Sequence, residues 1–126
     1  MGKETKALED RSEGETPINL SIFKLSKPLV YEDYNLTEIN LKLDSLTAAM
    51  SEEADCEYEE RGWRPDNSEG TKEADRRYAF LIAVKTSGIP REVLNNLTVD
   101  DYYAVVYRTM TFLSKKVSQA VEYLQK

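Results

Sequence analysis

The end of the chain carries the strongest local signal for secondary structure, and it limits the possible folds more than any other segment. Thr98-Val99-Asp100-Asp101 reads as a helix-capping box with aspartate in place of the more usual glutamate, and Leu97 and Tyr102 occupy the hydrophobic-staple positions. Apolar residues then recur at helical spacing, at Tyr102, Val106, Met110, Leu113, Val117 and Leu124. We therefore predict a long helix from Val99 to near the end, with a bend around Ser114.

Residues 26–43, SKPLVYEDYNLTEINLKL, predict strands. Residues 28–31 form an extended run, residues 20–25 before them could form another, and residues 32–35 supply turn chemistry. The apolar residues Ile39, Leu41 and Leu43 then alternate with polar ones, which indicates a strand with one buried face. Two or three short strands are not stable alone, so we expect this hairpin or small sheet to pack on helices.

Further helices are expected between the strands and the last helix. Asp44 or Ser45 would cap the first, which continues into the acidic residues 52–60, too acidic to bury and either exposed or frayed. Residues 61–70 read as a loop, whose Trp63 is expected to pack against the domain's own core.

The second of these helices would begin at Thr71 and stop at Gly88. Pro90 would then open a short helix that ends at Asn96. The expected fold is α+β: a single domain over residues 18–126, with a hairpin or small antiparallel sheet on three or four helices.

Polar composition sets the remaining boundaries of the domain. Residues 1–17 are charged and show no apolar period, so we expect a disordered arm there. A flexible acidic segment is expected near residues 52–70.

Composition also excludes several classes of function. The chain has no histidine, which removes Ser-His and Cys-His catalytic pairs, and Cys56 is its one cysteine, which suits a reducing cytosol. The net charge is −6 and the basic residues are scattered among acids, so nucleic acid is not expected as a partner. No apolar run reaches membrane-spanning length. The acidic run lacks the spacing of a calcium loop. We predict no enzyme, no metal and no cofactor.

The candidate binding residues are tyrosines of the last helix. Tyr102, Tyr103 and Tyr107 lie there, and Tyr102 and Tyr103 point in different directions, so at least one is expected outside the core. The competing interpretation is a half-buried core rim. The free edge of the hairpin is the second candidate surface, blunted on one side by Lys27 and Pro28. The long apolar stripe would also fit a second copy of the chain.

Two segments resemble one family. LSKPLVYEDYNLTEINLKL is similar to the opening of phage tail assembly chaperones of long-tailed bacteriophages. LIAVKTSGIPREVLNNLTVDDYYAVVYRTMTFL resembles the same family, in which a helix ends at a Gly-Ile-Pro turn and an L-x-x-x-D-Y pattern opens the last helix. The matching residues here are Gly88 to Pro90, Leu97, and Asp101-Tyr102. The likeness covers roughly residues 18–50 and 78–113; the arm and residues 52–70 match nothing in it.

The resemblance implies a function without catalysis. Such proteins bind the tape measure protein in the host cytoplasm and keep it soluble until tail tube subunits polymerise, and they are absent from the mature virion. The tail tube protein is a second implied partner. Two rival hypotheses are a minor structural tail or connector protein of the virion, and a small protein-binding regulatory module.

Overall fold

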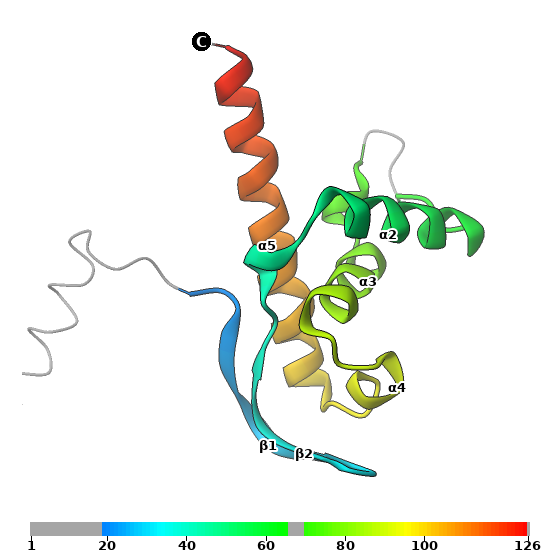
Figure 1. The fold of residues 1–126 in the computed structure, drawn as a ribbon, viewed down its shortest axis with the longest axis vertical. Helices are drawn as coiled ribbons and strands as arrows, with labels where there is room; N and C mark the ends of the chain where they lie inside the picture. The colour runs from blue at the N-terminus through cyan, green and yellow to red at the C-terminus, as the bar shows by residue number, and fades with distance from the viewer. Residues whose placement is uncertain (1–18, 66–69, 126) are drawn as a thin grey trace, which may run out of the picture.

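The computed structural model describes residues 19–65 and 70–125 (Figure 1). They form, in chain order, β1 (Ile22–Tyr31), β2 (Tyr34–Asn40), the 3-10 turn η1 (Leu43–Ser45), α2 (Ala48–Glu60), the 3-10 turn η2 (Lys72–Ala74), α3 (Arg76–Ser87), α4 (Arg91–Leu94) and α5 (Val99–Leu124). The predicted α+β class, with a hairpin on helices and a long C-terminal helix, is confirmed. The predicted arm over residues 1–17 lies outside the described residues.

The hairpin is simpler at its tip and less regular in its middle than the sequence indicated. Only residues 32 and 33 separate the strands, so the predicted turn at 32–35 is shorter than expected. The two expected extended segments form one strand, β1, which is interrupted by a bulge. Lys24 pairs with Glu38 and Leu29 pairs with Leu36, so β1 carries three more residues than β2 across this interval.

Two predicted helix starts were wrong by a few residues. Asp44 and Ser45 belong to η1, and α2 is instead capped by Thr47, whose hydroxyl accepts a hydrogen bond from a backbone N–H of the first turn. Thr71 precedes η2, while Asp75 caps α3 through its carboxylate. In both places a short 3-10 turn takes up the first good capping residue, and the true helix begins at the next one.

Helix α3 is the centre of the fold, because it is buried on two sides. One side joins the hairpin and the start of α5 in a cluster that contains Phe23, Ile39, Leu41, Leu43, Ala79, Phe80, Ala83, Leu94, Val105 and Val106. The other side joins α2 and the middle of α5 in a cluster that contains Ala54, Tyr58, Tyr78, Leu81, Ile82 and Leu113. Gly88 ends α3 in the left-handed conformation, as the sequence predicted.

The acidic residues 52–60 form the body of α2, and this helix is not fully exposed. Ala54 and Tyr58 are buried in the α2–α3 interface. Lys85 of α3 approaches Glu53 at 3.5 Å and Glu57 at 3.4 Å. The expectation that the run was too acidic to bury was therefore wrong for one face, because two small or aromatic residues at i, i+4 spacing form an apolar stripe between the acids.

The loop after α2 returns Trp63 to the core, as predicted. Its indole ring meets Tyr58 edge-on, with ring centroids 5.9 Å apart. The guanidinium groups of Arg61 and Arg77 lie over it at 5.0 and 5.4 Å from the ring centroid. Within the segment 52–70 that was expected to be flexible, residues up to Glu60 are helical, and residues 66–69 lie outside the described part of the chain.

A partly buried carboxylate ties α2 to the start of α3. Asp75 accepts hydrogen bonds from the Tyr58 hydroxyl and from the Arg77 guanidinium, at 2.7 Å for Nη2. Burial by itself raises the pKa of Asp75, but the hydrogen bonds from Arg77 and Tyr58 outweigh burial and lower this pKa to about 2. Burial and the bond to Asp75 raise the pKa of Tyr58 to about 12.

The lowered pKa of Asp75 predicts that the free energy of unfolding decreases in acid. The folded-state pKa of Asp75 lies below its ordinary value of 3.8, so ionised Asp75 stabilises the fold above about pH 4, and that contribution disappears as the pH falls toward 2. We expect Asp75→Asn to lower the free energy of unfolding at neutral pH by roughly 2 kcal/mol and to flatten its decline in acid. Urea unfolding measured from neutral pH down to about pH 2 tests this. An equally steep decline in the variant would contradict it.

A second buried carboxylate joins the hairpin to α5. The Thr98 hydroxyl caps α5 by accepting from the N–H of Asp101, as the sequence predicted, at 3.2 Å. The Asp101 carboxylate completes a different contact from the one expected in a capping box. Its two oxygens accept the backbone N–H of Ser26, each at 3.0 Å, and one also accepts the Ser26 hydroxyl at 3.0 Å. Asp101 thus holds the bulge of β1 against the first turn of α5.

Candidate protein-binding surface

The three candidate tyrosines form a ladder of rings that runs from the core to the surface. Phe80 lies 5.5 Å from Tyr102, Tyr102 lies 5.8 Å from Tyr103, and Tyr103 lies 6.0 Å from Tyr107, measured between ring centroids. Tyr102 packs against the core, whereas Tyr103 is 43% exposed and Tyr107 is 50% exposed. Tyr102 is thus a core-rim residue, and Tyr103 and Tyr107 present aromatic surface to solvent.

An arginine and a shallow concavity border this ladder. The Arg76 guanidinium lies 5.7 Å from the centroid of the Tyr103 ring. A concavity of about 410 Å³ lies between the start of α3 and α5, and Tyr102, Tyr107 and Met110 line its α5 side. Tyrosine, arginine and methionine are the residue types that interfaces favour. Arg76 carries no signal in the sequence, because only the packing of α3 against α5 brings it to the tyrosines.

The exposed apolar surface continues from the tyrosines along the whole of α5. We call it the docking stripe, and its members are the exposed Tyr103, Tyr107, Val117, Val121 and Leu124, together with Met110, which is half-buried against the core. With Ser114 between Met110 and Val117, these positions are separated by alternating steps of four and three residues. That spacing keeps them on one side of a helix and is the spacing of a coiled-coil seam. At about 1.5 Å per residue the stripe is roughly 30 Å long.

Within residues 19–65 and 70–125, no other element buries the far half of α5. Leu113 is the last buried residue of the helix, and every residue from Ser114 to Gln125 is exposed. Figure 1 shows this half projecting beyond the hairpin, α2 and α3. Val117 and Val121 are 46% and 47% exposed, and Leu124 is 81% exposed. A helix that keeps an apolar stripe in water over this length is typical of a surface that another chain covers.

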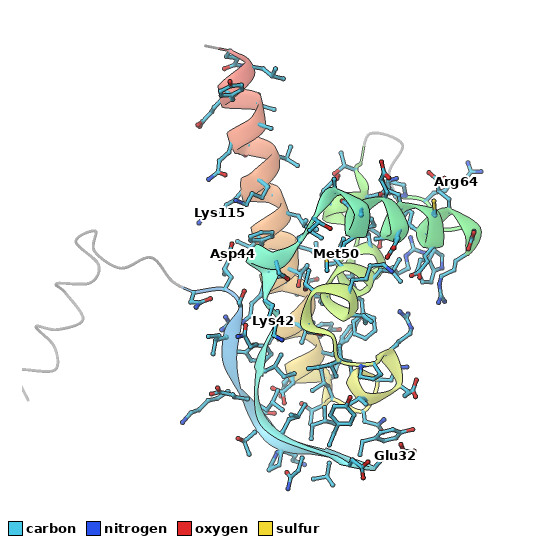
Figure 2. The ribbon with its side chains drawn as sticks, in the orientation of Figure 1. Glu32, Lys42, Asp44, Met50, Arg64 and Lys115 are labelled. Atoms are coloured by element: carbon cyan, nitrogen blue, oxygen red, sulfur yellow. The ribbon has the colours of Figure 1, made fainter. Side chains whose placement is uncertain are left out.

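The apolar positions of α5 form one stripe in the sequence, but in the structure some of them are buried and others are exposed. Tyr102, Val106 and Leu113 face the core, while Val117 and Leu124 lie beyond it. Helix α5 runs from Val99 to Leu124 as one helical element, with no break at the predicted bend near Ser114. Lys115 lies on the side of α5 that faces away from α2 and α3 (Figure 2).

The hairpin edge is a weaker candidate. Within the described residues the sheet has only two strands, so each strand has one unpaired edge. Val30 near the tip is 66% exposed, but Lys27 and Pro28 stand in the bulge of β1. A charged residue and a proline disfavour the addition of another strand at that edge. Strand β2 has no proline, but it carries the charged Glu38 and lacks a continuous apolar surface.

The described residues were also compared with the requirements of a metal site and of a membrane-spanning helix. In the ranges 19–65 and 70–125, no three side chains of the metal-ligating types gather closely enough to hold an ion. Cys56 is exposed on α2. None of the helices in these ranges combines the length and apolarity needed to cross a bilayer.

Comparison of this chain with protein-family models, with curated proteins and with solved structures finds no match.

Proposed function

We propose that this protein is an assembly chaperone of the phage tail type, which binds a helical partner along the docking stripe. One observation supports this most strongly: α5 carries an exposed apolar seam with four-and-three spacing, and its far half has no partner within the described chain. A seam of this kind packs best against a second helix, by knobs-into-holes contacts. The resemblance of residues 18–50 and 78–113 to tail assembly chaperones suggests the tape measure protein as that partner.

The stripe suits a protein that keeps another chain soluble. The tape measure protein of such phages is a long helical chain that aggregates when its apolar surface is left in water. A partner helix that packs on Val117, Val121 and Leu124 would bury there the apolar surface that causes its aggregation in water. The acidic charge of the chaperone, −6 overall, would keep the complex in solution. The proposed role involves no catalysis and no cofactor, and it is exercised in the host cytoplasm.

Co-expression tests the proposal. The chain is produced together with the tape measure protein of the same phage, and the soluble fraction of the latter is measured with and without it. We expect a complex to co-purify and the soluble fraction to rise several-fold. If the tape measure protein stays insoluble and no complex forms, the proposal is wrong.

Mass spectrometry of purified virions separates the chaperone from a structural tail protein. A chaperone leaves when the tail tube assembles, so its peptides should be missing from finished particles. Peptides at the level of other minor tail proteins would favour the structural alternative.

A further inference from the structure

The docking stripe itself is uncharged, and the charged residues around it are unevenly placed. The members of the stripe are uncharged, as are Ser118 and Ala120 beside it, whereas Lys115 and Glu122 lie farther around α5 in a groove that also borders Tyr107 and Met110. Glu122 is the one acidic residue of α5 after Asp101. At about 100° per residue it lies roughly 100° or more around the helix from Val117, Val121 and Leu124. The stripe therefore has no charge of its own.

One cation stands at the near end of this uncharged seam. Arg76 is exposed, and its guanidinium lies over the ring of Tyr103. Among the described residues no ion pair involves Arg76. The adjacent Asp75 carboxylate is occupied by Tyr58 and Arg77. Arg76 is thus a cation on aromatic surface, at the rim of the concavity, and no carboxylate of the described residues pairs with it.

An arginine in this setting favours an anionic partner group. A guanidinium stacked on an aromatic ring is held in place and partly desolvated, which strengthens its pairing with a carboxylate. In a chain of net charge −6, an acidic partner would otherwise be repelled. Arg76 offers one place where a carboxylate is attracted, and it lies at one end of the seam only.

We infer that the partner is an amphipathic helix that carries an aspartate or glutamate beside one end of its apolar seam, and that this carboxylate pairs with Arg76. The inference rests on the proposed function, since it assumes a helix on the docking stripe. The single charged contact fixes both the register of the partner helix and its direction along α5. A second copy of this chain fits less well, because Glu122, the one carboxylate of its far half, lies away from its own stripe.

Two synthetic peptides test the inference. Both have about 25 residues and leucines at four-and-three spacing on an alanine and glutamine background. One carries two glutamates beside the seam near one end, and the other carries two lysines at the same positions. Each is labelled with a dye and titrated with the full chain, and binding is followed by fluorescence anisotropy.

We expect the glutamate peptide to bind at least about tenfold more tightly than the lysine peptide. Arg76→Glu should reverse this order. Lys116→Glu is the matched control, because it makes the same change of charge about 180° around α5 from Tyr107 and should leave the order unchanged. Equal affinities, or an order that Arg76→Glu does not reverse, would overturn the inference while leaving the docking stripe in place.

Other outcomes separate the inference from the proposed function. If neither peptide binds, or if binding survives Val117→Glu with Val121→Glu, the docking stripe itself is wrong and both proposals fall. The direction of the bound peptide along α5 can be measured separately. A nitroxide at the glutamate end should broaden NMR signals of Tyr103 and spare those of Leu124, and the reverse pattern would overturn the assigned direction.

Discussion

The double variant Val117→Glu with Val121→Glu is expected to bind the helical partner at least about 100-fold more weakly than the natural chain. Burial of each valine contributes roughly 1.5 kcal/mol, and a glutamate in its place must lose its hydration without a cation to pair with. Together these terms exceed the roughly 2.7 kcal/mol that corresponds to 100-fold. Titration of the labelled glutamate peptide, or co-purification of the tape measure protein, measures the effect.

The same variant should fold normally. Val117 and Val121 are nearly half exposed and contact no core cluster, and glutamate forms helix at least as well as valine. The matched control is Lys115→Gln with Gln119→Glu, which changes the net charge by the same amount on the opposite side of α5 and should bind normally. A control that loses as much affinity as the valine variant would show that charge, and not the apolar stripe, governs binding.

Asp101→Ala is expected to lower the free energy of unfolding by about 2–4 kcal/mol. The carboxylate is buried and accepts both the N–H and the hydroxyl of Ser26. Hydrogen bonds to a charged group are worth about 1.5–3 kcal/mol each, and alanine would leave the Ser26 N–H without its acceptor. Urea unfolding at neutral pH gives the change as a shift of the midpoint.

The neighbouring Asp100 provides the control for Asp101. It lies in the same first turn of α5 but is exposed, so Asp100→Ala removes only a favourable interaction with the helix dipole, worth about 0.3–1 kcal/mol. Asp101→Asn keeps one acceptor oxygen and should fall between the two. Equal losses for Asp100→Ala and Asp101→Ala would mean that the contact with the β1 bulge contributes nothing.

Sequence reasoning succeeded where the signal was local. The cap at Thr98 and the stop at Gly88 depend on a few neighbouring positions, and they were predicted correctly. The alternation of Ile39, Leu41 and Leu43 correctly predicted their burial, but β2 ends at Asn40 and Leu43 begins η1, so the predicted strand was too long. Asp101 shows the limit of such reasoning. Its place in a capping box suggested a bond within the helix turn, but its partner Ser26 is 75 residues away in sequence. Tertiary packing decides whether the Asp101 carboxylate bonds within its own helix turn or to Ser26.

The candidate surface was predictable only in part. Periodicity correctly placed Tyr103 and Tyr107 on a long amphipathic helix, but it could not show where the rest of the domain stops covering that helix. Val106 and Val117 look alike in the pattern, yet the first is fully buried and the second is exposed. Arg76 carried no signal at all, since its position beside Tyr103 arises from how α3 packs on α5.

Amide hydrogen exchange on the full chain tests the docking stripe most directly. In the free protein, residues 114–124 are exposed and none is buried by the described part of the chain, so their amides should exchange much faster than those of residues 105–113. Saturation with the glutamate peptide should slow exchange in residues 114–124 by at least about tenfold, because a docked helix holds that half of α5 closed. Unchanged exchange there, or protection confined to the hairpin, would contradict the assignment of α5 as the binding surface.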